Sequence, residues 1–202
     1  EPAAFDAKGI WSEERMCLLM ETKIRQAESV KDSVCGQFQW IYSSHDNPGR
    51  RQPDEALRRI DKVGPFNYKG LVTPWEEPLD VYYMYKSNYR LPEEEPMVYL
   101  VSHTWNNRFE KSGRRRATIE AYSNCDSVLL YNDATNDVYL GRKVNHGRGT
   151  HFTWENRDIR YNVLRAVGYY DGKPAAEDVL VLKGLKRAPH FEALYRPSAI
   201  VP

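Results

Sequence analysis

Residues 121–133 read Ala-Tyr-Ser-Asn-Cys-Asp-Ser-Val-Leu-Leu-Tyr-Asn-Asp, and this stretch decides the fold of the chain. The pair Ser123-Asn124 separates two short apolar runs, and a second polar pair, Asn132-Asp133, ends the second run. Short apolar runs bounded by such residues are typical of β-strands, because Ser, Asn and Asp side chains bond to the nearby backbone at turns. The stretch therefore predicts a strand, a turn and a second strand.

The same pattern continues on both sides of this stretch. It predicts strands over residues 97–103, 117–122, 127–131, 138–142, 150–154, 162–170 and 177–182. The pair Asp171-Gly172 lies between the last two strands and is typical of a type I′ hairpin turn. About seven short strands over roughly ninety residues indicate an immunoglobulin-like antiparallel β-sandwich. We assign this sandwich to residues 96–185, with Glu93-Glu94-Glu95-Pro96 as the boundary before it.

The first part of the chain has a different pattern. Ser12 is a good helix N-cap, and Glu13 and Glu14 follow in the first turn, where the helix dipole favours negative charge. Apolar residues then recur with a helical period as far as about Ser33. A short strand is expected over residues 37–42, a long polar loop over 43–66 and a second helix over 79–89. Residues 186–202 are expected to form a linker or a C-terminal arm.

Composition excludes several classes of function. The chain has 202 residues and a net charge of +1, so it lacks the overall positive charge that draws proteins to nucleic acid or anionic membranes. One basic run, residues 111–116, is weak support for nucleic-acid binding on a neutral chain. No apolar run reaches the length of a membrane span, and no signal peptide is visible at the N-terminus. We expect no nucleic-acid partner and no membrane partner.

Metal and cofactor chemistry also lack a sequence signal. Cys17, Cys35 and Cys125 form no Cys-x-x-Cys motif, and they are expected to be buried free thiols. The five histidines show no ligand spacing. The sequence therefore predicts neither a metal site nor a cofactor.

Three stretches resemble glycoside hydrolase family 2, which includes β-galactosidases, β-glucuronidases and β-mannosidases. Residues 34–40, Val-Cys-Gly-Gln-Phe-Gln-Trp, resemble the last strand of that family's (β/α)8 TIM barrel. Residues 68–75 and the helix over 78–87 resemble the segment that closes the barrel. Residues 121–130, 140–143, 150–154, 164–169 and 175–178 resemble the β-sandwich that follows the barrel in many bacterial members.

The resemblance implies a mixed α+β chain. Residues 1–95 would be the C-terminal segment of a TIM-barrel catalytic domain, and 96–185 the immunoglobulin-like sandwich. The closest similarity within the family is to enzymes of the β-galactosidase type. The chain would then be part of a retaining glycoside hydrolase that acts on β-linked galactosides or related oligosaccharides. The partners implied are a carbohydrate substrate and the remainder of the catalytic barrel, supplied by an upstream segment or another chain.

The resemblance also implies which residues bind and which do not catalyse. The family's two catalytic carboxylates are expected outside this chain, and Glu13 and Glu14 are expected at a solvated helix start. Trp40 matches a Trp that packs on the sugar, which is the favoured interpretation; the alternative is a core residue of the barrel. Ser44, His45, Asp46 and Asn47 follow at the same rim and could bind sugar hydroxyls or simply form a turn. The alternative function is a non-catalytic β-sandwich module that binds carbohydrate or protein.

Overall fold

The computed structural model describes residues 12–46, 66–67, 69–110 and 116–196. The chain falls into two compact units, which meet in sequence between Tyr83 and Met84. The helix α2 (Asp80–Tyr89) contains this junction. The domain ranges expected from the sequence, with a boundary near residue 95, stay a prediction.

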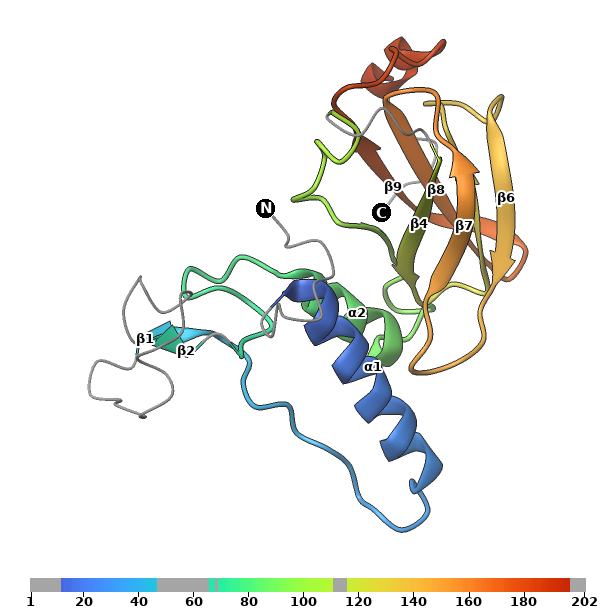
Figure 1. Ribbon diagram of the computed structural model, residues 1–202. Helices are drawn as coiled ribbons and strands as arrows, with labels where there is room; N and C mark the ends of the chain where they lie inside the picture. The colour runs from blue at the N-terminus through green and yellow to red at the C-terminus, as the bar shows by residue number, and fades with distance from the viewer. Residues whose placement is uncertain (1–11, 47–65, 68, 111–115, 197–202) are drawn as a thin grey trace. The chain divides into compact units, whose positions relative to one another are not determined.

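The larger unit contains a β-sandwich, as the sequence predicted. One sheet has the strand order β3-β4-β7, with β3 (Val98–Val101), β4 (Arg116–Ser123) and β7 (Phe152–Asp158). The other sheet has the order β6-β5-β8-β9 (Figure 1), with β5 (Ser127–Tyr131), β6 (Tyr139–Val144), β8 (Val163–Tyr170) and β9 (Lys173–Val181). Every pairing is antiparallel. Each of the seven predicted strands is present, with its ends shifted by a few residues.

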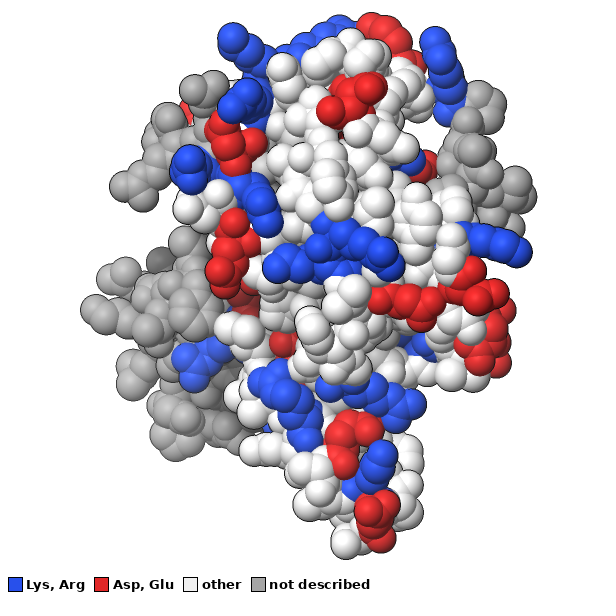
Figure 2. Space-filling model, turned by 90° about the vertical axis from the view of Figure 1, so that its right-hand side faces the viewer, with Lys and Arg blue, Asp and Glu red and all other residues white. Residues whose placement is uncertain are grey.

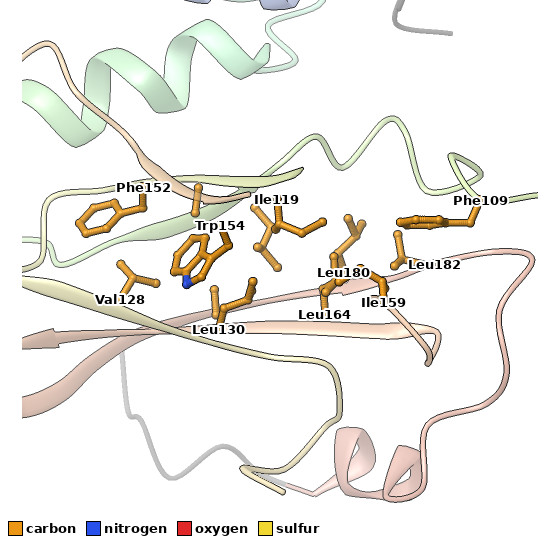
Figure 3. Packing of buried hydrophobic residues seen from close by; sticks show 13 residues of the cluster. Phe109, Ile119, Val128, Leu130, Phe152, Trp154, Ile159, Leu164, Leu180 and Leu182 are labelled. Atoms are coloured by element: carbon orange, nitrogen blue, oxygen red, sulfur yellow. The ribbon is translucent and has the colours of Figure 1, made fainter. Parts of the chain in front are cut away.

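Alternating side chains from the two sheets form the core of the sandwich. In β5, Val128 and Leu130 point inward, and in β7 the inward residues are Phe152 and Trp154. Figure 3 shows Trp154 between the two sheets, close to Leu130 and Val128. The Trp154 ring is fully buried, and its Nε1 donates to the Gly141 carbonyl of β6 at 3.0 Å. This bond ties strands of different sheets together through the core.

Turn chemistry explains how the strands are joined. Asp171 and Gly172 have φ values of 49° and 72° between β8 and β9. Positive φ at both central residues is what a type I′ turn requires, so this hairpin prediction is confirmed.

Buried asparagines hold the connections around the sandwich. Asn132, with no exposed surface, donates to the carbonyls of Tyr161 and Val163 and accepts from the amides of Arg160 and Tyr161. Asn124 bonds in a similar way to the segment that precedes β3. Its Oδ1 accepts from the Met97 amide at 2.8 Å, and its Nδ2 donates to the carbonyls of Arg90 and Glu95. One side chain thus satisfies several backbone groups that no strand ladder reaches.

The tail after β9 lies against the sandwich as far as the 3-10 helix η2 (Phe191–Tyr195). The Ala188 amide donates to Asn162 Oδ1 at 2.8 Å, and Ala188 is buried. We call residues 186–196 the C-terminal arm; of the expected arm, residues 197–202 lie outside the described part of the chain.

The smaller unit contains α1 (Glu13–Ser29), which begins at the predicted N-cap. The Ser12 hydroxyl accepts the Arg15 amide at 3.3 Å. Cys17, Met20 and Ile24 are buried on one side, whereas Leu18 and Leu19 stay about half exposed. Within the described residues, no helix has both the length and the apolarity that a membrane span needs.

The strand predicted over residues 37–42 is wrong. Residues 34–39 have no strand pairing in the structure, and the Phe38 side chain is fully exposed. A strand forms only where a neighbour supplies hydrogen bonds, and sequence alternation cannot show whether that neighbour is present. Pairing begins at Ile41, where the candidate site starts.

Candidate functional site

The candidate site is built on two short segments that run side by side. The Ile41 amide donates to the Lys69 carbonyl at 3.3 Å, the Val72 amide to the Tyr42 carbonyl at 3.0 Å, and Ser43 forms a parallel bridge with Val72. Just beyond, β1 (His45–Asp46) pairs antiparallel with β2 (Phe66–Asn67). These pairings hold residues 41–46 beside residues 66–67 and 69–72, although the paired residues are twenty or more positions apart in the sequence.

Ser44 and Gly70 lie in close contact between the two segments. The Gly70 amide donates to Ser44 Oγ at 3.1 Å, and the Ser44 amide donates to the Val72 carbonyl at 3.0 Å. A Cβ atom at Gly70 would lie 2.1 Å from the Ser44 nitrogen, so only glycine fits. Ser44 is buried, and these contacts give it a structural role; its predicted contact with a sugar stays a prediction.

Trp40 lies immediately before this pairing and is exposed. Its side chain is 69% accessible, so it is not a core residue of the smaller unit. Tyr42 and Trp75 are exposed as well. An indole offers a flat apolar face and a polar edge, which suits packing against the C–H face of a pyranose. Both interpretations of Trp40, a sugar platform and a core residue of the barrel, stay predictions.

The rest of the predicted rim is only partly described. His45 is half-buried, with Nδ1 3.5 Å from the Ser43 carbonyl, and Asp46 is exposed. Ser44, His45 and Asp46 are consecutive residues, and the first of them lies four positions after Trp40. Asn47 lies outside the described residues, so its predicted role stays a prediction.

Lys69 is a candidate that the sequence analysis did not assign. Its carbonyl accepts from the residue that follows Trp40, and its own amide donates to Asn67 Oδ1 at 3.2 Å. Lys69 is half-buried and Asn67 is buried. The sequence could not show this placement, because residues 40 and 69 are far apart in the chain and become neighbours only through the parallel pairing.

Glu13 does not lie at a solvated helix start, and that expectation is wrong. Its Oε2 accepts the Asp80 amide at 2.9 Å, so the carboxylate caps the N-terminus of α2. Burial, followed by the nearby Asp80 carboxylate, raises the pKa of Glu13 above its ordinary value. A carboxylate is favourable at a helix N-terminus, and here the carboxylate comes from α1 and caps α2, so it links the two helices.

Several aromatic residues and acids of the sandwich have structural partners. Trp154 and Tyr122 are buried. His103 Nε2 and the Leu100 amide both bond to Asp178 Oδ2, at 2.7 and 2.6 Å. On the face shown in Figure 2, basic and acidic side chains are interspersed. Most of the basic run, residues 111–115, lies outside the described part.

Comparison with known proteins identifies a matching family and a similar protein. Residues 115–176 match the family described as "Domain of unknown function (DUF4982)". A protein of Formosa agariphila named "Putative beta-glucuronidase" is 33% identical over 123 residues, which are 61% of this chain and 13% of that protein.

Solved structures give a longer match. The β-glucuronidase of Parabacteroides merdae is 26% identical with a TM-score of 0.67, over 90% of this chain and 21% of its own. The β-glucuronidase 3 of Bacteroides uniformis is 25% identical with a TM-score of 0.68, over 90% and 22%. A β-glucuronidase described as belonging to glycoside hydrolase family 2 shares the fold, with a TM-score of 0.61. The chain thus spans between 16% and 22% of the length of these structures. It is similar to part of the Parabacteroides merdae and Bacteroides uniformis β-glucuronidases in sequence and fold, and to part of the family 2 β-glucuronidase, at 23% identity, in fold.

Proposed function

We propose that this chain is part of a retaining family 2 glycoside hydrolase that acts on β-glucuronides. One observation carries the proposal: similarity to the Parabacteroides merdae β-glucuronidase over 90% of the chain, in sequence and in fold. In this proposal residues 1–95 are the end of the catalytic (β/α)8 barrel, and the sandwich follows it. The similarity is to enzymes, so it gives no support to the alternative of a non-catalytic binding module.

The substrate in this proposal differs from the galactoside that the sequence suggested. The relatives reported above are β-glucuronidases, and none of them is a β-galactosidase. A glucuronide carries a carboxylate where a galactoside carries a neutral hydroxymethyl group. A site for glucuronides therefore needs a cation or several hydrogen-bond donors at that position, which a galactoside site does not need.

Lys69 meets this requirement. It is a half-buried cation whose backbone is bonded to the residue after Trp40, so its long side chain starts beside the proposed sugar platform. An ammonium group partly shielded from water binds a carboxylate more strongly than an exposed one does. We assign Lys69 to the sugar carboxylate, Trp40 to the sugar face, and His45, Asp46 and Asn47 to its hydroxyl groups.

The reaction itself needs groups from the rest of the enzyme. Retaining hydrolysis uses two carboxyl groups about 5 Å apart, one as nucleophile and one as acid/base. Glu13 is committed to the amide of Asp80, so it is not one of this pair in our proposal. The chain contributes a wall of the sugar pocket, and both carboxyl groups come from the remainder of the barrel.

Exposed apolar surface on the smaller unit supports a partner of this kind. Leu18 and Leu19 of α1 are 45% and 50% exposed, and Phe38 is completely exposed. Soluble proteins rarely leave such groups of large apolar side chains uncovered unless they form an interface. We propose that the remainder of the catalytic barrel covers them.

Replacing Lys69 by Met tests the assignment in a form of the protein extended upstream to the length of its relatives. We expect kcat/KM for an aryl β-glucuronide to fall tenfold to hundredfold, because a hydrogen bond to a charged group contributes about 1.5–3 kcal/mol. Turnover of a neutral aryl glycoside should not fall. The matched control is Lys23→Met, an exposed position on α1, which should leave both activities unchanged. An equal loss on charged and neutral substrates would refute the role of Lys69.

A further inference from the structure

A cluster of metal-ligand side chains lies in the sandwich and shares no residue with the site described above. It consists of Asp133 and Asp137, from the turn between β5 and β6, and His190, from the C-terminal arm. We call these three residues the Asp-His cluster. Their ligand atoms, one from each residue, all lie within 4.8 Å of one another. Sequence spacing gave no sign of it, because His190 is 57 residues from Asp133.

The geometry of the cluster resembles one side of a coordination sphere. His190 Nδ1 lies 2.7 Å from Asp133 Oδ2 and 3.4 Å from Asp137 Oδ2. The Thr135 hydroxyl lies 2.5 Å from the same Asp137 oxygen. Ligand atoms about 2.0–2.2 Å from a tetrahedral zinc ion are roughly 3.4 Å apart, so small shifts would bring the three atoms to a common centre.

The ligand atoms are held in place by the surrounding backbone. Asp133 is fully buried, and its Oδ1 accepts the amides of Ala134 and His190, at 2.8 and 3.2 Å. These bonds turn Oδ2 toward the cluster. Asn132, the neighbouring residue, fixes the same turn through its own four hydrogen bonds. Asp137 and His190 remain 65% and 50% exposed, so an ion can enter from solvent.

The charges of the cluster favour a divalent cation. Two carboxylates face each other around one imidazole, which leaves two negative charges when the histidine is neutral. A divalent ion would balance both charges and take a neutral imidazole nitrogen as its third ligand. One nitrogen and two oxygens suit Zn²⁺, whereas Ca²⁺ prefers six or more oxygens.

We propose that Asp133, Asp137 and His190 form a zinc-binding site that fastens the C-terminal arm to the β5–β6 turn. Thr135 would orient Asp137 by its hydroxyl hydrogen bond, as outer groups commonly orient metal ligands. This proposal does not depend on the glycosidase function, because the cluster belongs to the sandwich unit and contains no residue of the sugar site.

Calorimetric titration of the metal-free chain with Zn²⁺ tests the site. Cys35 is exposed, so the buried thiol that the sequence predicted there is wrong, and because this thiol would compete for zinc the titration is made in a Cys35→Ser background. We expect one ion per chain and a rise in Tm. The variants Asp137→Asn and His190→Gln, confirmed as folded by circular dichroism, should each weaken binding at least tenfold. His146→Gln, an exposed histidine outside the cluster, is the matched control and should bind as tightly as the parent.

Limited proteolysis adds a readout of the arm itself. Cleavage within residues 186–196 should slow when zinc is bound, and this protection should vanish in His190→Gln. The proposal is overturned if no stoichiometric zinc binding occurs at millimolar metal, or if His190→Gln and Asp137→Asn bind as tightly as His146→Gln. In either case the cluster is a hydrogen-bonded contact between the arm and the turn.

Discussion

At the scale of single residues, Gly70 shows how one small side chain shapes the candidate site. Its amide bonds to Ser44 Oγ, and the backbone of Ser44 lies where a Cβ atom would have to be. The sequence could indicate that residues 68–75 matter, through the resemblance to family 2. It could not show this contact, because local patterns carry no information on which loop approaches a glycine.

We expect Gly70→Ala to lower the free energy of unfolding by about 2 kcal/mol or more, since Ser44 backbone atoms must move. Urea denaturation of the chain measures the change. Gly36→Ala is the comparison: Gly36 has a positive φ of 149°, which Gly70 does not have, but a Cβ there would meet nothing within 4 Å, so its cost is backbone strain without crowding. Equal effects of the two substitutions would show that the crowding at Ser44 is unimportant.

At the scale of elements, the accuracy of sequence-based prediction depends on the hydrogen-bonding partner that each element needs in order to form. The strands of the sandwich follow from turn residues and alternation, and each of them finds a partner strand in the chain, even where that partner lies more than thirty residues away, as for β4 and β7. Residues 37–42 have similar composition but no strand pairing before Ile41, so the same rules failed there. Of the candidate site, sequence reasoning proposed residues 40 and 44–47, whose roles stay predictions, whereas the pairing that adds Lys69 required the structure.

Trp154 links the elements of the two sheets, and its substitution by Phe should separate packing from hydrogen bonding. We expect Trp154→Phe to cost about 2–3 kcal/mol, because the Gly141 carbonyl loses its donor and a small cavity remains. Thermal unfolding followed by near-UV circular dichroism measures it. The same change at Trp75, which is 76% exposed, should cost less than about 0.5 kcal/mol. A similar small cost at both positions would argue against the described core.

At the scale of the whole molecule, the ion pair between Glu120 and His151 makes the stability of the chain depend on pH in the acid range. The His151 side chain, 3.6 Å away, lowers the pKa of Glu120, and this outweighs the opposing effect of burial. A carboxyl group whose pKa is lowered on folding adds stability above its ordinary value of 4.5 and loses it as the pH falls through the folded-state pKa. Glu120→Gln should therefore reduce the difference in unfolding free energy between pH 6 and pH 3. An unchanged difference would show that other groups govern acid unfolding.

The central proposal concerns the whole molecule: this chain would be one wall of a β-glucuronide site that other parts of a larger enzyme complete. The most direct measurement is hydrolysis of paired aryl β-glucuronide and β-galactoside substrates by the 202-residue chain and by a form extended upstream. We predict no turnover by the 202-residue chain, and turnover of the glucuronide in preference to the galactoside by the extended form. Turnover by the 202-residue chain alone, or a preference of the extended form for the galactoside, would contradict the claim.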